Sequence, residues 1–162
     1  MLIDVYESKL KKTYDIDQLQ FHTPPATSFL RLHQPNQFGD DLSSFRETVV
    51  LANKERKIVS GIEIGRGGPG LRIVYPANYD SQHLGTIEFG LGLGNILTSI
   101  NHALNVEYAI GIKKDVFEKA KRFKAEANDI INNNVIFYEY SNEFAKDLVG
   151  NEELNNEIKK IS

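Results

Sequence analysis

The sequence predicts an α+β domain built around an antiparallel sheet, and three observations lead to this class. Strand-like segments of alternating polarity cluster in the middle of the chain, over residues 59–89. The linkers between these segments are short and rich in turn residues, which favours hairpins over parallel crossovers. Helical patterns lie towards both ends of the chain, at 2–14 and 142–161.

The first helix is predicted over residues 2–14. Ile3, Tyr6, Leu10 and Tyr14 recur at three- and four-residue spacing, and no glycine or proline interrupts them. The apolar stripe is narrow. It suits packing on one partner surface or on a second copy of the chain, so a homodimer through this helix is one expected assembly.

The other elements follow from the same patterns. Strands are predicted at 28–33, 59–64, 71–75, 83–89, 106–112 and 135–140, and helices at 42–56, 94–104, 114–131 and 142–161. Asp40 and Asp41 are predicted to cap the helix at 42–56, and Arg46 borders the buried side of that helix. No repeat or long linker divides the chain. We therefore expect one domain over residues 1–162, with a sheet of about five to six strands.

Composition excludes several classes of protein. The absence of cysteine rules out a disulfide scaffold, a thiolate zinc site, an iron–sulfur cluster and a cysteine nucleophile. The net charge of −3 argues against a dedicated nucleic-acid-binding protein. The four histidines are isolated in sequence, and neither a catalytic motif nor a span of about 20 apolar residues occurs. We expect no enzyme activity, no metal and no cofactor.

A glycine-rich loop offers an alternative function. Gly65, Gly67 and Gly70 match the spacing of a dinucleotide-binding loop, which would make the chain a small nucleotide-binding enzyme. That loop functions where it opens a helix, because the helix N-terminus holds the phosphates. Here a strand pattern follows at 71–75, and Pro69 lies inside the loop. A glycine-rich hairpin is therefore favoured.

The predicted strands carry a charged face. If the apolar residues of these strands face the core, alternation places the following side chains opposite them: Arg31, His33, Glu63, Arg72, Thr86 and Glu88. Arg46 could approach this face from its helix. One interpretation is a solvated surface with weak cross-strand ion pairs. The other is a polar pocket for a small carboxylate-bearing solute, because arginine binds carboxylates with two parallel hydrogen bonds. Periodicity alone leaves both open, together with a purely structural module.

Several ordered blocks resemble one known family. They are FHTPPATSFLRLH at 21–33, FGDDLSSFR at 38–46, VVLAN at 49–53, VSGIEIG at 59–65, GLR at 70–72 and GTIEFG at 85–90, and the detailed match covers residues 21–90. These blocks resemble the Cache sensor domains of methyl-accepting chemotaxis proteins and of related sensor kinases and cyclases.

The resemblance implies a PAS-like fold, with a long N-terminal helix on one side of an antiparallel sheet and a ligand pocket on the other. It implies an extracytoplasmic, periplasmic sensory region of an inner-membrane receptor, anchored by segments outside these 162 residues. It favours the pocket over the solvated face, with a carboxylate or amino acid as ligand and helix displacement as the signal. A chemotaxis transducer is the first expectation, and a histidine kinase or diguanylate cyclase is the alternative. The expected ligand-binding residues are Arg31, His33, Arg46, Glu63, Arg72, Tyr75 and Glu88.

Overall fold

The computed structural model describes residues 2–65, 68–119, 129–151 and 153. The chain divides into two compact units, Met1–Leu93 and Gly94–Ser162. The expectation of one sensory domain over residues 1–162 stays a prediction. Among the described residues, no helix combines the length and apolar composition that crossing a bilayer requires.

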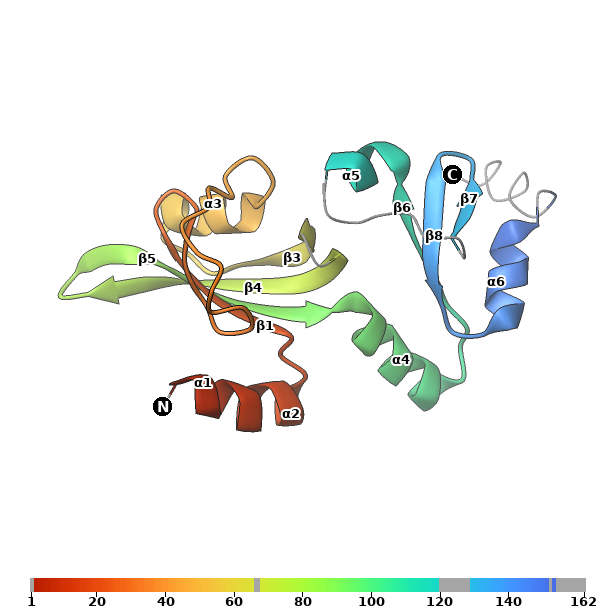
Figure 1. Cartoon of the computed structure of the whole chain (residues 1–162), viewed down its shortest axis with the longest axis horizontal. Coiled ribbons are helices and arrows are strands. Elements are labelled where there is room, and N and C mark those ends of the chain that lie inside the picture. Colours follow the sequence, from red (N-terminus) through yellow and green to blue (C-terminus); the bar gives the residue numbers. More distant parts are fainter. Residues whose placement is uncertain (1, 66–67, 120–128, 152, 154–162) are drawn as a thin grey trace. The chain divides into compact units, whose positions relative to one another are not determined.

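The first unit is built on a five-stranded antiparallel sheet (Figure 1). Its strands are β1 (Gln18–Thr23), β2 (Thr27–Arg31), β3 (Val59–Gly65), β4 (Gly68–Tyr79) and β5 (Gln82–Gly92). Their spatial order is β2-β1-β5-β4-β3. The pairs β1–β2, β3–β4 and β4–β5 adjoin in sequence, as short linkers dictate. The pairing of β1 with β5 joins the two groups of strands and completes the sheet. The α+β class and its antiparallel sheet are thus confirmed.

Helices lie on both faces of this sheet. The N-terminal helical segment, formed by α1 (Leu2–Val5), η1 (Tyr6–Leu10) and α2 (Lys11–Tyr14), covers one face, and α3 (Glu47–Glu55) covers the other (Figure 1). Tyr6 is fully buried against Leu19 and Leu32. Its hydroxyl donates a hydrogen bond to the Asp17 carbonyl oxygen at 2.6 Å, which fixes the helix to the start of β1.

The N-terminal helix is predicted correctly in extent, but its apolar stripe is not kept on one face. Residues Tyr6–Leu10 form a π-helical segment, in which the hydrogen bonds span five residues instead of four. The wider turn rotates the residues before and after it relative to one another. Tyr14, beyond this segment, is exposed, whereas Tyr6 at its start is buried; Ile3, in the turn before it, is exposed as well.

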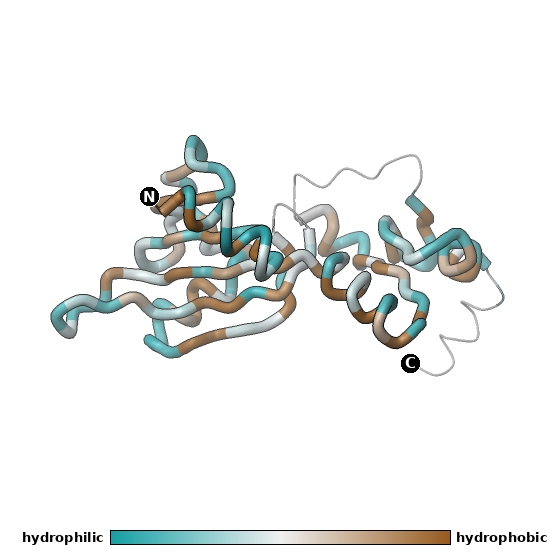
Figure 2. Tube along the Cα trace, turned by 90° about the horizontal axis from the view of Figure 1, so that it is seen from below, coloured by the Kyte–Doolittle hydropathy of each residue, from teal (hydrophilic) through white to brown (hydrophobic). Residues whose placement is uncertain are grey.

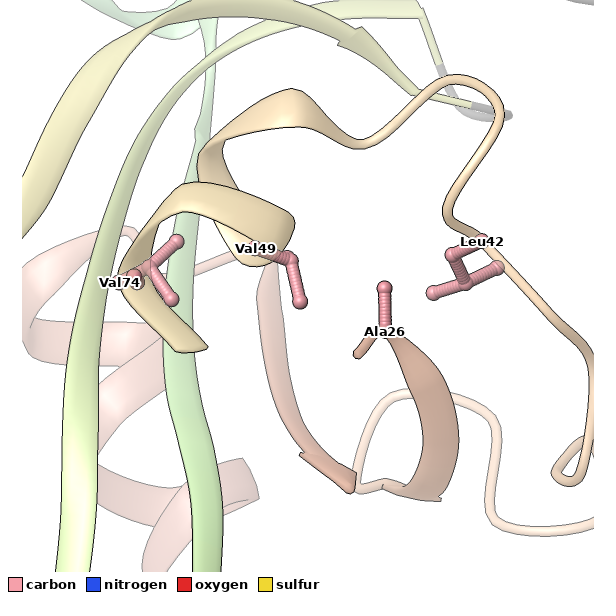
Figure 3. Close-up of a cluster of buried hydrophobic side chains, with 5 residues drawn as sticks. Ala26, Leu42, Val49 and Val74 are labelled. Atoms are coloured by element: carbon pink, nitrogen blue, oxygen red, sulfur yellow. The ribbon is translucent and has the colours of Figure 1, made fainter. Parts of the chain in front are cut away.

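The contact between α3 and the sheet contains a small apolar cluster. Val49 of α3 packs with Val74 of β4, with Ala26 of the β1–β2 turn and with Leu42 of the preceding loop (Figure 3). The helix begins at Glu47 rather than at residue 42, so the predicted range 42–56 is too long. Asp41 accepts a hydrogen bond from the Ser43 backbone N–H at 2.9 Å, and Asp40 pairs with Arg31. Neither aspartate caps α3, because Asp41 binds the Ser43 N–H within the loop and Asp40 binds Arg31 of β2.

The second unit contains a three-stranded antiparallel sheet of order β6-β8-β7 (Figure 1). Its elements are α4 (Leu93–Leu104), β6 (Ala109–Lys113), α5 (Lys114–Lys119), β7 (Ile130–Asn132), β8 (Val135–Tyr140) and α6 (Glu143–Gly150). The helix predicted over 114–131 is wrong at its end, because residues 130–132 pair with β8 as a strand. Its segment 120–128 lies outside the described residues. The helix predicted over 142–161 is confirmed as far as Gly150, and most of its remainder also lies outside them.

Candidate functional site

The charged face of the first sheet is buried. Arg31, Arg72, Thr86 and Glu88 are all at most 5% exposed. On the opposite, apolar face, Ile62 is 66% exposed, since the N-terminal helix packs over residues of β1, β2 and β5 rather than over β3. Figure 2 shows hydrophilic and hydrophobic residues following one another along these strands. The solvated-face interpretation of the charged residues is therefore wrong, because α3 and its preceding loop cover them.

Arg46 joins α3 to two carboxylates of the sheet. It precedes the first helical residue, and its guanidinium points onto β3 and β5. Its Nε donates to Glu63 Oε2 at 2.7 Å, and its Nη2 donates to Glu88 Oε1 at 2.5 Å. Glu63 also accepts from the Thr48 backbone N–H at 3.0 Å and from the Thr48 hydroxyl at 2.8 Å. The glutamate thus satisfies a free N–H at the start of α3.

Arg72 lies deeper in the same group and is only 2% exposed. Its Nη1 donates to Gln18 Oε1 at 2.8 Å and lies 3.7 Å from Glu88 Oε1. Three glycines leave the space that its guanidinium fills. A Cβ atom would come within 2.0 Å of Arg72 Nη1 if built on Gly90, within 3.1 Å of Nη2 on Gly65, and within 3.2 Å of Cζ on Gly70. The glycine-rich ends of β3, β4 and β5 therefore accommodate an arginine.

Gly90→Ala is expected to lower the free energy of unfolding by about 1–3 kcal/mol, because the added methyl group overlaps the buried Arg72 guanidinium. Chemical denaturation of the unsubstituted protein and of Gly90→Ala measures this difference in the free energy of unfolding. Gly61→Ala is the matched control, since a Cβ there meets nothing within 4 Å and the strand position favours alanine over glycine. Equal stability of the Gly90 and Gly61 variants would contradict the assignment of these glycines to Arg72.

His22 of β1 extends this network of buried polar side chains towards α3. Asn53 of α3 donates through Nδ2 to the Pro25 and Val49 carbonyl oxygens and to Thr86 Oγ1 at 3.3 Å. The Thr86 hydroxyl is therefore free to donate to His22 Nδ1, 3.1 Å away. When the hydrogen bond runs in this direction, the neutral imidazole carries its proton on Nε2. That atom lies 3.5 Å from Glu88 Oε2, and neither atom has a hydrogen-bond partner among the described residues.

We call His22, Arg46, Glu63, Arg72 and Glu88 the buried charge cluster. Burial raises the pKa of Glu88, but Arg46, His22 and Arg72 outweigh it and hold this pKa below its ordinary value. Burial lowers the pKa of Arg46, whereas Glu88 and Glu63 raise it above its ordinary value. Burial lowers the pKa of His22 to about 4. The cluster therefore holds charged arginines and carboxylates beside a neutral imidazole at neutral pH.

Arg31 lies on the same face but is bound by its own loop. Its two terminal nitrogens donate to the two Asp40 carboxylate oxygens at 2.7 and 2.9 Å, and Nη1 also donates to the Gln37 carbonyl oxygen. The loop that follows Arg31 returns along β2. There the Gly39 N–H donates to the Ser28 carbonyl oxygen, and the Ser28 N–H donates to the Asp40 carbonyl oxygen. Arg31 thereby fixes the loop that leads into α3.

The structure brings together most of the site residues expected from the sequence. Arg46, Glu63, Arg72 and Glu88 form one network, and Arg31 shares their face. His33 follows β2 and is partly buried, and burial lowers its pKa. Tyr75 is not brought to the cluster. It is 42% exposed and its ring stands edge-on to that of Phe89, 6.1 Å away. Roles in ligand binding stay predictions for all seven residues.

Sequence reasoning missed β1 and, with it, two polar residues of the site. Gln18 and His22 reach the buried face from this strand, and Asn53 reaches Thr86 from α3. The signal was present in the alternation of polar Gln18, Gln20 and His22 with apolar Leu19 and Phe21. Two glutamines in six residues masked it, because glutamine has no preference for strands.

The nucleotide-binding alternative does not fit the described part of the glycine loop. Gly65 pairs with Gly68 as the last rung of the β3–β4 ladder, and Gly70 lies within β4, opposite Glu63 of β3. No helix N-terminus follows Gly70, so the backbone N–H groups that would hold a phosphate are engaged in a sheet instead. The glycine-rich hairpin is confirmed.

Comparison with known proteins identifies the family. No curated protein shows significant similarity to the chain. Residues 2–147 match the family model dCache_3, described as the double sensory domain of two-component sensor kinases. The match spans both units of the structure and agrees with the antiparallel sheet and the N-terminal helix seen here. The chain belongs to the Cache family of sensory domains.

Proposed function

We propose that the chain is the extracytoplasmic, ligand-binding sensory region of an inner-membrane transducer, and that its ligand is a small solute bearing a carboxylate. The observation that carries this proposal is the buried charge cluster, which lies between the sheet and α3 of a Cache domain. Burying ionised groups is costly and does little for stability when a hydrophobic core could replace them. Polar atoms without partners in such a place are candidates for ligand contacts.

The route of the signal follows from the two faces of the first sheet. The charge cluster and α3 occupy one face, and the N-terminal helical segment packs on the other through Tyr6. A solute that binds one arrangement of α3 better than another shifts the population between them. A coupling free energy of about 1–3 kcal/mol is enough to bias an output. We propose that the N-terminal helix is displaced in response.

The output of the complete protein is also a proposal. The resemblance suggested a methyl-accepting chemotaxis protein first, with a histidine kinase or a diguanylate cyclase as the alternative. The family description supports the kinase. In each case the sensory region acts by binding rather than by catalysis. A homodimer through the N-terminal helix is proposed as well, and the exposed Leu2, Ile3 and Val5 support it.

Thermal unfolding of the 162-residue chain in the presence of small solutes tests the proposal. We expect at least one carboxylate from a panel of organic acids and amino acids to raise the unfolding temperature in a saturable way, because binding to the folded state alone stabilises it. Chloride at the same ionic strength is the control for salt effects. If no carboxylate of the panel changes the unfolding temperature beyond the chloride control, the proposed function is wrong.

A further inference from the structure

The two edges of the five-stranded sheet differ in what covers them. The edge strand β2 is bound along its outer side by its own loop, through the Ser28 N–H and carbonyl oxygen and through a bridge between Thr27 and Asp41. The edge strand β3 pairs with β4, and no described residue forms a backbone hydrogen bond with its outer side. Ser60 and Ile62 of β3 are exposed, Ile62 by 66%. The sheet therefore has one covered edge and, within the described part of the chain, one open edge.

The hydrogen bonding of β4 and β5 shows which backbone groups of β3 point to the open edge. Gly92 of β5 donates its N–H to the Asp17 carboxylate, away from β4, so its pair with Gly70 of β4 is not hydrogen-bonded. Successive residues bond alternately to the two sides of a strand, so Gly70 bonds to Glu63 of β3. The groups that face the open edge are therefore the N–H and C=O of Ser60, Ile62 and Ile64. Pro69 agrees with this pattern, because it lies opposite Ile64 and has no N–H to donate to it.

β3 also lacks the features that usually prevent an edge strand from pairing. Such strands are commonly very short, or are interrupted by lysine, proline or a bulge. β3 has seven residues, VSGIEIG, with no lysine or proline, and its ladder with β4 runs without a shift of register. An open strand of this kind is a template for the addition of another strand.

We propose that β3 pairs antiparallel with β3 of a second copy of the chain, about a two-fold axis at Ile62. This register sets Ile62 opposite Ile62 of the second copy, and Ser60 opposite Ile64. Each of these pairs exchanges two hydrogen bonds, so the three pairs give about six bonds between the copies. Every outward N–H and C=O group of Ser60, Ile62 and Ile64 is then satisfied in both strands, whereas any other register leaves some of them unpaired.

The side chains of β3 fit a second copy in the same register. Glu63 is the one charged residue of this strand, and it lies opposite Gly61 of the second copy. A register shifted by two residues would instead set the two Glu63 side chains opposite each other, where like charges repel. On the other face, the exposed Ile62 side chains of the two copies lie opposite and cover each other. The strand is therefore complementary to itself in shape, charge and hydrogen bonding.

This interface is distinct from the homodimer proposed through the N-terminal helix. The N-terminal helical segment packs on residues of β1, β2 and β5, whereas β3 lies at the far edge of the sheet. On the other face, Val49 packs α3 onto Val74 of β4, one strand inward from that edge. Pairing through β3 therefore needs no rearrangement of either helix, and it does not depend on the ligand.

Analytical ultracentrifugation of the 162-residue chain measures the proposed dimer. We expect concentration-dependent dimerisation, with a dissociation constant about tenfold higher in Ile62→Lys, because this change removes the apolar contact and opposes two like charges at the axis. Tyr79→Lys is the matched control, since Tyr79 is exposed near the β4–β5 turn and the change of charge is the same. Ile3→Lys alters the exposed side of the N-terminal helix and should leave the β3 dimer intact.

Cysteine cross-linking tests the register, because the chain has no cysteine of its own. Opposite residues of a hydrogen-bonded pair have Cα atoms about 5.5 Å apart, which a disulfide can span. Ile62→Cys should therefore cross-link to itself when oxidised with diamide. Ser60→Cys is the control on the same face, since its two copies would lie about 13 Å apart along the strands. It should cross-link only when it is mixed with Ile64→Cys.

Hydrogen exchange of the unsubstituted protein gives a measurement that does not depend on the folding of a variant. The amides of Ser60, Ile62 and Ile64 should exchange more slowly as the protein concentration rises. Protection that is already complete in the dilute monomer would show that another segment of the chain covers this edge, and would overturn the proposal. The proposal is also wrong if the chain is monomeric at every concentration, if Ile3→Lys disrupts the dimer and Ile62→Lys does not, or if Ser60→Cys cross-links to itself as readily as Ile62→Cys.

Discussion

Replacing Glu88 by glutamine is expected to lower the free energy of unfolding by about 3–5 kcal/mol at pH 7, the usual cost of removing one partner from a buried ion pair. Glu88 is fully buried, and its carboxylate is shared by Arg46 at 2.5 Å, by His22 at 3.5 Å and by Arg72 at 3.7 Å. Glutamine keeps the size of the side chain but removes the negative charge. Arg46 and Arg72 would then share a low-dielectric region with one remaining carboxylate, Glu63.

Urea denaturation of the unsubstituted protein and of Glu88→Gln measures this difference. Glu55→Gln is the matched control, because Glu55 is exposed at the end of α3 and should change stability by less than about 0.5 kcal/mol. A loss below about 1 kcal/mol in Glu88→Gln would contradict the role of Glu88. It would mean that water or a rearranged side chain compensates both arginines in the folded state.

The sequence was sufficient to place most of the charged residues of the site on one face. Strict alternation along strands gathers Arg31, Glu63, Arg72 and Glu88 whatever the sheet order. It did not indicate which face is covered. Hydrophobicity suggested that the apolar face is the core, yet Ile62 of that face is exposed and Glu88 is fully buried. The difference arises from α3, because Arg46 and Thr48 at its start provide the donors that allow the helix to pack on carboxylates.

The pairing within the site could not be predicted from the sequence. It depends on β1 lying between β2 and β5, which sets Gln20 opposite both Arg31 and Glu88 and brings His22 opposite Thr86. The β1–β5 pairs join residues that are more than 60 positions apart in sequence (His22 with Thr86, Gln20 with Glu88), and a shift of register by one residue would turn every side chain to the other face. Asp40 illustrates the same limit. Its position before a helix suggested a cap. Its carboxylate instead binds the charged Arg31, because a hydrogen bond between two ionised groups is stronger than one to a backbone N–H.

Acidification is expected to destabilise the protein between pH 6.5 and pH 4, and His22 is expected to be a main cause. Burial lowers the pKa of His22 from 6.5 to about 4. Above pH 6.5 the imidazole is neutral in both the folded and the unfolded chain, so it contributes no pH dependence. Between pH 6.5 and pH 4 the unfolded chain binds a proton that the folded chain does not, and stability falls. The interval of about 2.5 pH units corresponds to a loss of about 3 kcal/mol.

His22→Gln should remove this part of the pH dependence, because glutamine does not titrate and can still accept from Thr86. We expect the free energy of unfolding to fall by about 3 kcal/mol less in the variant than in the unsubstituted protein from pH 7.5 to pH 4. Burial lowers the pKa of His33 as well, so a smaller loss in the same direction should remain in the variant. His102→Gln is the control, since His102 is exposed on α4 and its replacement should leave the pH dependence unchanged. Parallel curves for the His22 variant and the unsubstituted protein would show that the pKa of His22 is the same in the folded and the unfolded chain, and would contradict the lowered pKa of this residue.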